Sequence, residues 1–399
     1  MPSQPIRGRV VSVDGCLVRV QRQAGVEEAE VVGELPAIGD VVEIERATRT
    51  CRVLTPWRGP AGGLPTWMRH VASERRVRGT TVRAQVEAGI RAFFGARDFV
   101  ETRTPVRVPC PGLEPHIKPF EVSAGGFLHT SPELAMKRLL VGGLERIFQI
   151  ASVFRDEPHA PTHLSEFSML EWYRAYADEH AIMADTEALV AELAVRVQGT
   201  TRVSFAGRVI DLTPPWPRAS VRELYAAHAG VDLREDTDLR GVCARLGVAC
   251  AADDGWDDLY FRIWLERIEP RLPADRPLFV TRYPASQAAL AVVDADADGT
   301  RWARRFEAYM GGLELANAFY ELTDVAVQRR RFEDDLALRA RVHGDSFPRV
   351  PLDEGFLAAL AEGMPPSAGI ALGVDRLVML LADEPDIAYT TWLSYDFQH

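Results

Sequence analysis

The chain has 399 residues, 47% of them hydrophobic, and a formal net charge of −11. A chain of this length and composition can bury at least one full-sized hydrophobic core. No run approaches the roughly 18 apolar residues that cross a bilayer, and the N-terminal MPSQPIRGRV lacks the pattern of a signal peptide. We therefore expect a cytoplasmic protein with no membrane partner. The acidic balance disfavours nonspecific binding to nucleic acid, which depends on clustered positive charge.

The cysteines and lysines narrow the chemistry. Five cysteines without a C-x-x-C pair argue against a disulfide framework and a structural zinc site. Of 46 basic residues, only Lys118 and Lys137 are lysine. In so arginine-rich a chain, a surviving lysine can mark a place that accepts a compact ammonium but not a planar guanidinium, and chance survival is an equally open alternative.

The first part of the chain has a β pattern. Residues 6–54 contain short β-like runs separated by Gly, Pro and Asp turn residues, which predicts a small all-β module over residues 1–60. The Pro- and Gly-rich segment TPWRGPAGGLPTW is typical of a linker, and the composition changes after it. A second domain, residues 67–399, is therefore predicted to begin near Trp67.

The second domain alternates between helical and strand patterns. Helical periodicity over residues 78–97 precedes the strand-like FVETRTPVRVP, and SPELAMKRLL begins a helix with Ser131 as N-cap and Pro132 at the first helical position. Surface helices are predicted over residues 178–198 and 220–246, and strands over RPLFVTRYP, AALAVVDAD, RRFEAYM and LELANAF. This succession predicts an α+β fold, one large antiparallel sheet flanked by helices.

Three acidic residues recur every seven positions in RRFEAYMGGLELANAFYELTD. If its two strands form a hairpin at Gly311 and Gly312, Glu307 and Glu314 come roughly opposite each other, with Glu321 further along. Facing carboxylates repel unless a cation lies between them, and magnesium held by carboxylates and phosphate oxygens would meet that need. A solvated acidic face with coincidental spacing is the alternative.

The segment GIALGVDRLVMLLAD predicts a buried strand, a tight turn and an apolar helix that opens with Asp375 and Arg376. An arginine at a helix start opposes the helix dipole, so it needs a partner such as a phosphate or an aromatic ring. The alternative is an ordinary surface arginine.

The segment FRDEPHAPTHLSEFSMLEWY combines charged residues with a buried-strand pattern. Arg155 can pair with a phosphate or carboxylate, and Glu157 shares its face if the segment is a strand. His159 and His163 have a helical metal-site spacing, but Pro158 and Pro161 break any helix there, so we reject a zinc site. His163 is instead predicted to touch phosphate from a loop.

Taken in order, the helix with FVETRTPVRVP, then FRDE with its histidine and EF, then GIALGVDRLVM resemble motifs one, two and three of the class II aminoacyl-tRNA synthetases. SPELAMKRLLVGG, EFSMLEWY, ELANAFYELTD and ALGVDRLVML resemble the lysine branch. Over residues 67–395, YPASQAALA and GMPPSAGIALGVDRLVML resemble the elongation factor P lysine ligase family, truncated paralogues of lysyl-tRNA synthetase without an anticodon domain. In the motif-two loop, Leu164 and Ser165 stand directly after His163, where the family often has asparagine and proline.

This resemblance implies ATP-dependent activation of lysine or β-lysine to an acyl-adenylate, and transfer to a lysine side chain of elongation factor P. It implies an amino-acid pocket lined by Ser131, Pro132, Glu133, Tyr173, Glu321 and Ala371. It implies an ATP site formed by Arg155, Asp156, Glu157, His163, Phe167, Glu314, Leu315, Gly373 and Arg376. It further implies that Arg155 and Arg376 are catalytic and that Glu307 and Glu314 hold Mg²⁺.

The resemblance also implies a homodimer built through motif one, and a protein acceptor in place of tRNA. The roughly fifty β-like residues are expected to be too few for an anticodon-binding barrel. Charging of tRNA stays open as an alternative, but RGRVVSVDGCLVRVQRQ offers four arginines and no aromatic residue for base stacking. A non-catalytic regulator is the other alternative, and the presence of Arg155, Glu307, Glu314 and Arg376 speaks against it. Ala371 stands where lysyl-tRNA synthetases have glycine, which predicts a preference for β-lysine.

Overall fold

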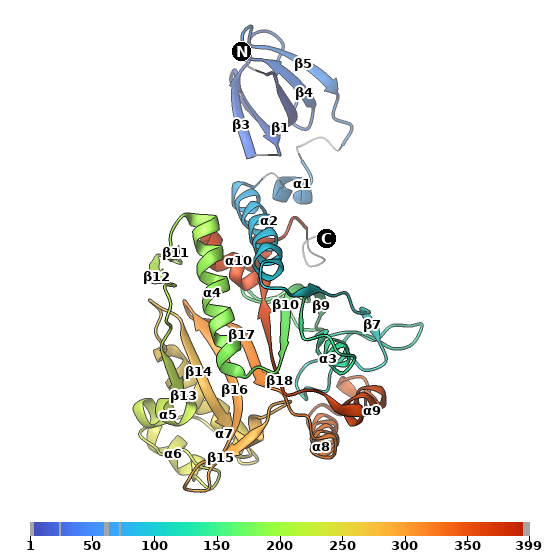
Figure 1. Ribbon diagram of the computed structural model, residues 1–399. Helices are drawn as coiled ribbons and strands as arrows, with labels where there is room; N and C mark the ends of the chain where they lie inside the picture. Colours follow the sequence, from blue (N-terminus) through green and yellow to red (C-terminus); the bar gives the residue numbers. More distant parts are fainter. Residues whose placement is uncertain (1–3, 24, 60–63, 72, 394–399) are drawn as a thin grey trace. The chain divides into compact units, whose positions relative to one another are not determined.

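The computed structural model describes residues 4–23, 25–59, 64–71 and 73–393 (Figure 1). The chain divides into two compact units, Met1–Ala84 with Asp386–His399, and Gln85–Pro385. No helix among these described residues is long and apolar enough to cross a membrane. The domain boundaries expected from the sequence stay a prediction.

The first unit contains a five-stranded antiparallel sheet in the order β3-β2-β1-β4-β5. Its strands are β1 (Ile6–Asp14), β2 (Leu17–Arg22), β3 (Gly25–Glu30), β4 (Val41–Glu45) and β5 (Thr50–Thr55). Alternate residues point inward and form a small core of Ile6, Val10, Val18, Val20, Val31, Val42 and Ile44. The predicted all-β module is confirmed. The sheet runs from β3 at one edge to β5 at the other, and the expectation that this module is too small for an anticodon-binding barrel stays a prediction.

The first unit also holds α1 (Thr66–Val71), the first half of α2 (Glu74–Gly95) and the 3-10 turn η5 (Ile387–Thr390). Arg83 Nε donates to the carbonyl of Thr390 at 2.7 Å, and the Arg75 guanidinium lies 4.0 Å from the centre of the Tyr389 ring. These contacts hold residues 389 and 390 against the start of α2.

The second unit is built on one large sheet in the order β13-β14-β16-β17-β18-β10-β9-β6, with β15 paired to β16. Its strands are β6 (Val100–Glu101), β9 (Arg146–Phe154), β10 (Glu166–Ala175), β13 (Arg218–Ser220), β14 (Leu278–Pro284), β15 (Val293–Ala295), β16 (Arg301–Met310), β17 (Leu313–Tyr320) and β18 (Ser367–Gly373). The interior of the sheet is antiparallel, as expected, and only β6 and β13 pair in parallel. The α+β prediction is therefore confirmed.

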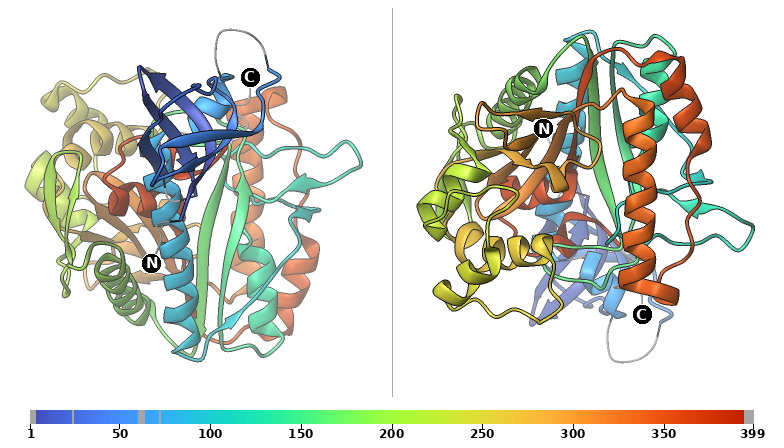
Figure 2. Two further views of the ribbon diagram at one scale, coloured as in Figure 1. Left: turned by 90° about the horizontal axis from the view of Figure 1, so that it is seen from above. Right: turned by 90° about the horizontal axis from the view of Figure 1, so that it is seen from below.

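Helices lie on both faces of this sheet. They are the second half of α2, α3 (Glu133–Val141), α4 (Glu179–Gln198), α5 (Val221–Ala229), α6 (Leu239–Leu246), α7 (Trp256–Ile263), α8 (Val325–His343), α9 (Glu354–Gly363) and α10 (Val374–Ala382). Phe94 of α2 packs on Trp172 of β10, with ring centroids 5.3 Å apart. Figure 2 shows α2 on one side of the long strands and α8 with α9 on the other.

Short strands complete the unit: β7 (Arg107–Val108), β8 (Phe127–Leu128), β11 (Arg202–Phe205) and β12 (Arg208–Asp211). Two local predictions need correction. FVETRTPVRVP contributes only the two-residue strands β6 and β7, because its prolines cannot donate ladder hydrogen bonds. The helix expected from Pro132 begins at Glu133, although the Ser131 hydroxyl does accept a hydrogen bond from the Glu133 amide at 3.0 Å.

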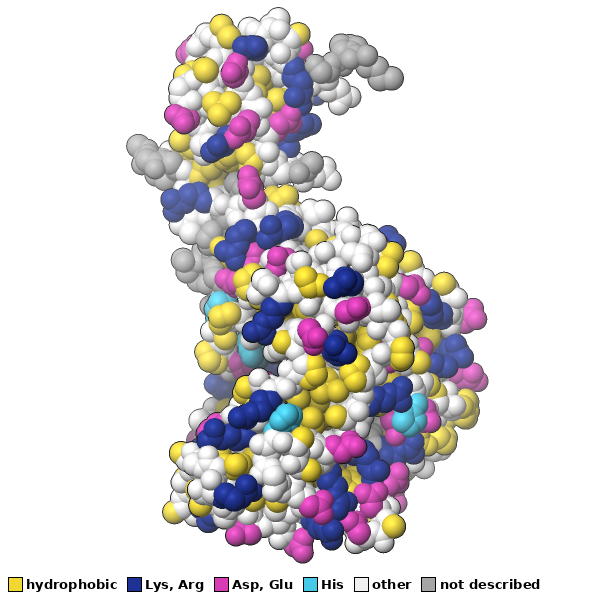
Figure 3. All heavy atoms as spheres, turned by 90° about the vertical axis from the view of Figure 1, so that its left-hand side faces the viewer, with side chains coloured by type: hydrophobic (Ala, Val, Ile, Leu, Met, Phe, Trp, Pro, Cys, Tyr) yellow, Lys and Arg dark blue, Asp and Glu magenta, His cyan; other side chains and the backbone are white. Residues whose placement is uncertain are grey.

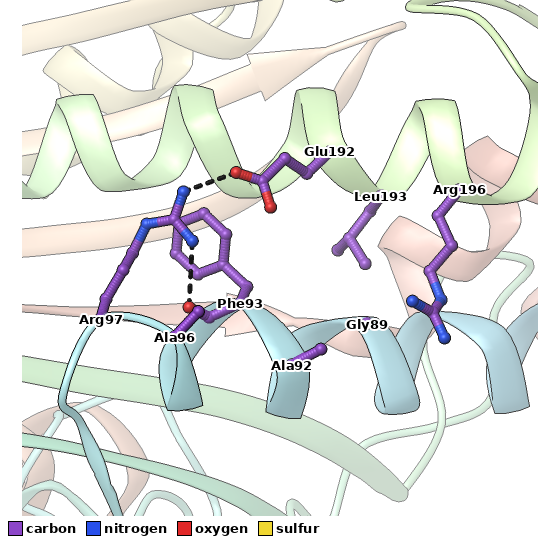
Figure 4. A pocket seen from close by; sticks show the side chains of 8 residues that line it. All are labelled: Gly89, Ala92, Phe93, Ala96, Arg97, Glu192, Leu193 and Arg196. Carbon is purple, nitrogen blue, oxygen red and sulfur yellow. Dashed lines mark hydrogen bonds and ion pairs between the residues drawn. The ribbon is translucent and has the colours of Figure 1, made fainter.

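A glycine lets α2 and α4 approach closely. A Cβ at Gly89 would lie 2.4 Å from Leu193 Cδ2 and 2.9 Å from Arg196 Cδ. Beside this contact lies a shallow pocket of about 150 Å³, and Arg97 crosses one end of it to donate to Glu192 Oε1 at 2.5 Å (Figure 4). The pocket is thus a groove between two packed helices.

Candidate active site

Strands β10, β17 and β18 bring the predicted pocket residues to one face of the large sheet. Glu171 lies directly opposite Ala371, and Tyr173 opposite Gly369. Asn317 is the partner of Ala371 on the other side. Directly paired residues of antiparallel strands point to the same face, so these side chains share one surface.

Glu171 is the centre of a buried hydrogen-bond cluster on this face. Its Oε1 accepts a hydrogen bond from Ser131 Oγ at 2.5 Å, and its Oε2 accepts one from the Tyr173 phenol at 2.9 Å. A Cβ at Gly369 would lie 2.2 Å from the Tyr173 ring and 2.9 Å from Glu321 Oε1, so only glycine leaves room for both side chains.

Lys137 joins two further carboxylates to this cluster. Its Nζ lies 2.6 Å from Glu133 Oε1 and 2.5 Å from Glu321 Oε2, and the side chain is 1% exposed. The second oxygen of Glu321, Oε1, is buried without a hydrogen-bond partner among the described residues. The arginine-rich chain has therefore kept a lysine where a compact ammonium fits between two carboxylates.

Burial shifts the pKa of the groups in this cluster. The pKa of Glu171 is raised to about 8 by burial and by the nearby Glu133 carboxylate. Burial also raises the pKa of Glu321 to about 8, although Lys137 acts in the opposite direction. Burial disfavours the charged form of Lys137, but Glu133 and Glu321 outweigh it and raise its pKa above the usual range. The cluster can hold more positive charge than Lys137 alone supplies.

Arg155, directly after the end of β9, and Phe167, near the start of β10, lie next to each other. The Arg155 guanidinium lies 5.3 Å from the centre of the Phe167 ring, and its Nε is buried without a partner among the residues described. Asp156 pairs instead with Lys118, whose Nζ lies 2.6 Å from its Oδ2. Glu157 is not on a strand with Arg155, because β9 ends at Phe154 and the next residues form a loop.

Arg376 fastens the motif-two loop to the start of α10. Its Nη1 donates to the carbonyl of Glu314 at 2.7 Å, its Nε to that of Thr162 at 3.2 Å, and its Nη2 lies 2.9 Å from His163 Nε2. Burial and Arg376 lower the pKa of His163, so its ring is neutral and can accept this hydrogen bond. Leu164, where the family pattern differs, is a buried anchor of the loop.

Glu307 and Glu314 do not lie directly opposite each other, which corrects the predicted hairpin register. A bulge between Ala308 and Tyr309 places Glu307 opposite Asn317 and Glu314 opposite Tyr309. The two carboxylates still interact, because surrounding protein atoms and Glu307 raise the pKa of Glu314 to about 7 while its side chain remains reachable by solvent. Glu307 is paired with Arg305, but the Glu314 carboxylate has no ion pair among the described residues and is free to bind a divalent cation.

The remaining predicted residues have backbone or packing positions. Pro132 and Leu315 are buried, and Gly373 lies opposite Met169 and immediately before α10. The structure thus brings the predicted residues of the amino-acid pocket together at one place. Arg155 lies with Phe167 at a second place, and Arg376 lies with His163 and Glu314 at a third. The roles assigned to all of them stay predictions.

Several residues of the site were not predicted. Glu171 could have been, because a lone carboxylate in the apolar strand MLEWY needs a partner when buried. Glu114 gave no such indication, since it lies in a loop. Burial and Glu133 raise its pKa, and Arg339 Nη1 donates to its carbonyl at 3.1 Å.

Comparison with known proteins identifies the family of this chain. Residues 67–394 match the family of class II tRNA synthetases (D, K and N), so the chain belongs to that family. It is 39% identical over 328 residues to the lysine–tRNA ligase of Anaeromyxobacter dehalogenans (strain 2CP-C) and 38% identical over 314 residues to that of Moorella thermoacetica (strain ATCC 39073 / JCM 9320). In both cases the match covers 76% of this chain and 62% of the relative. The chain therefore spans less than two thirds of the length of these curated relatives.

Proposed function

We propose that this protein activates lysine or β-lysine with ATP to an acyl-adenylate and transfers the acyl group to a lysine side chain of elongation factor P. The observation that carries the proposal is the gathering of Glu133, Glu171 and Glu321 around the single ammonium of Lys137. When all four are ionised, two negative charges remain uncompensated. A substrate with two ammonium groups supplies the matching charge.

In the first step, a carboxylate oxygen of the amino acid attacks the α-phosphorus of ATP. The new O–P bond forms as the bond to the leaving pyrophosphate breaks. The unpartnered Nε of Arg155 fits a hydrogen bond to the α-phosphate or the substrate carboxylate. Arg376 and His163 hold the motif-two loop next to this position. Glu307 and Glu314 would hold Mg²⁺, which would supply positive charge for the pyrophosphate oxygens.

In the second step, the neutral ε-amine of the acceptor lysine attacks the carbonyl carbon of the adenylate. An amide bond forms, AMP leaves, and the amine proton passes to solvent. The main contribution of the protein in both steps is to position the reactants and neutralise charge, so no general base is required.

The first unit supports a protein acceptor over tRNA. Residues 1–59 contain eight arginines and eight acidic residues. Exposed arginines of its strands and of the turn before β5 pair with neighbouring glutamates: Arg7 and Arg52 with Glu43, Arg19 with Glu28, and Arg49 with Glu30. A surface neutralised in this way releases few counterions on binding RNA. Figure 3 likewise shows basic and acidic side chains interspersed over the face drawn.

The strands of the first unit also lack aromatic side chains on which a base could stack. The Trp57 ring packs against Gly39, so closely that a Cβ at Gly39 would lie 2.5 Å from the ring. Lysine–tRNA ligase activity remains the second candidate, because the relatives carry the name lysine–tRNA ligase.

The test is to incubate purified elongation factor P with the enzyme, ATP and either lysine isomer, and to measure its intact mass. We expect the mass to rise by one acyl residue, and an Arg155→Ala enzyme to give no change. A parallel reaction offers lysine tRNA to the full chain and to a chain lacking residues 1–60. Efficient tRNA charging that is lost on the deletion, without modification of elongation factor P, would favour the second candidate.

A further inference from the structure

Glu307 is held by three hydrogen-bond donors. Its Oε2 accepts hydrogen bonds from the phenols of Tyr283 at 2.6 Å and Tyr309 at 2.8 Å, and its Oε1 accepts one from Arg305 Nη2 at 2.5 Å. Glu307 is 7% exposed, and each tyrosine is 4% exposed. Water therefore has little access to replace these bonds, and the carboxylate is fixed in one orientation.

Arg305 is itself anchored on two sides. Its Nε donates to Asn317 Oδ1 at 3.0 Å and its Nη1 to the carbonyl of Gln287 at 2.8 Å. Its guanidinium lies 4.4 Å from the centre of the Tyr283 ring. Side chains and backbone from β14, the turn after it, β16 and β17 thus form one network around Glu307.

The donors leave Glu307 with one vacant acceptor position. Each carboxylate oxygen has two lone pairs. The two phenols use both on Oε2, and Arg305 uses one on Oε1, so a single lone pair on Oε1 remains. Glu314 is different, because its carboxylate has no hydrogen bond or ion pair with any residue in the described part of the chain.

We propose that Tyr283 and Tyr309 are positioning residues for the Mg²⁺ site. They occupy Oε2 of Glu307 and leave Oε1 as its one ligand atom, while Glu314 supplies a carboxylate that adjusts to the bound nucleotide. This inference rests on the proposed function, since it assigns the tyrosines to the ATP-activating site. Groups that orient a metal ligand in this way typically contribute ten- to a hundredfold in metal affinity.

The experiment measures Mg²⁺ affinity by calorimetry in full-length protein saturated with a nonhydrolysable ATP analogue. We expect Tyr283→Phe and Tyr309→Phe each to raise the Kd for Mg²⁺ by about tenfold or more. The matched control is Tyr225→Phe. It removes a buried phenol that makes no hydrogen bond with Glu307 and donates instead to the Tyr260 carbonyl, at a distance of 2.7 Å. It should leave the Kd unchanged, and thermal melts without metal check that each variant is folded.

A double-mutant cycle with Glu307→Gln separates positioning from general structural support. If the phenols act through the Glu307 carboxylate, Tyr309→Phe has less than about twofold effect in the Glu307→Gln background. An equal effect in both backgrounds overturns the proposal, as does an unchanged Kd in both folded single variants. The wild type could instead show no lysine-dependent pyrophosphate exchange while Mg²⁺ binding and the double-mutant cycle give the expected results. That outcome would refute the proposed substrate and leave the positioning role intact.

Discussion

Ala371 is the residue on which the choice between lysine isomers is predicted to depend. It lies between Glu171 and Asn317 on the pocket face. The resemblance places its methyl group where an α-amino group would sit, and a β-amino acid carries its amine one carbon further along. We expect Ala371→Gly to raise the use of α-lysine relative to β-lysine by about ten- to two-hundredfold, the usual effect of one methyl group in a tight pocket.

The measurement is kcat/KM for adenylation of both isomers by wild type and variant. Ala368, a buried alanine on the same strand whose side chain points to the opposite face, provides the control as Ala368→Gly. An isomer ratio that does not move in Ala371→Gly would remove this residue from the specificity argument.

Glu171 and Glu321 predict a pH dependence for amino-acid binding. Burial raises the pKa of both to about 8, so below that pH the empty site holds protons that the substrate ammonium must displace. The KM for lysine should therefore fall as pH rises from about 6 to 8, by up to about tenfold per unit for each proton displaced. The ε-amine of lysine stays protonated to about pH 10.

The stability of the ligand-free protein should fall as pH rises, while the affinity for lysine increases. The folded state binds more protons than the unfolded state between the usual carboxyl pKa and about 8, so these groups stabilise at low pH and lose that contribution as pH rises through this window. Glu321→Gln should weaken the pH dependence of the KM for lysine. It should also remove the contribution of Glu321 to the pH dependence of the melting temperature. A KM for lysine independent of pH over this range would contradict the assignment.

At the scale of elements, the packing of α2 on α4 depends on Gly89. A large side chain there would meet Leu193 and Arg196, and overpacking of this kind typically costs about 1–3 kcal/mol. We expect Gly89→Leu to lower the free energy of unfolding by that amount. Gly95→Ala at the end of the same helix is the control, because a Cβ there meets nothing within 4 Å. Urea titrations of both variants check the prediction, and equal stability would show that the helices can separate without cost.

Element type could be predicted from sequence more reliably than pairing. Helical periodicity and alternating apolar residues depend on neighbours along the chain, so α2, β10, β16 and β17 were identified. The bulge between Ala308 and Tyr309 depends on how two strands fit together, and it moved Glu307 out of line with Glu314. In the site, the acidic repeat and motifs two and three could be recognised in the sequence. The cluster of Lys137 with its carboxylates could not, because it forms only when a helix and a strand far apart in the sequence meet.

At the scale of the whole molecule, a homodimer is predicted from the resemblance of α2 and the following segment to motif one. Val100 and Val106 in that segment are 51% and 41% exposed, and a partner subunit would cover such apolar groups. Obligate interfaces of this kind bury above about 2,000 Å². Light scattering at micromolar concentration should give a dimer mass for the wild type and a lower mass for Val106→Asp, with Val195→Asp, at an exposed valine of α4, as control. A monomeric wild type would refute the prediction.

Pyrophosphate exchange with ATP across a panel of amino acids tests the central claim most directly. The paired charges of the Lys137 cluster predict exchange with lysine or β-lysine, and none with norleucine, which has nearly the same length but lacks the terminal ammonium. Comparable exchange with norleucine, or none with either lysine isomer, would contradict the account that Glu133, Glu171 and Glu321 select a substrate with two ammonium groups.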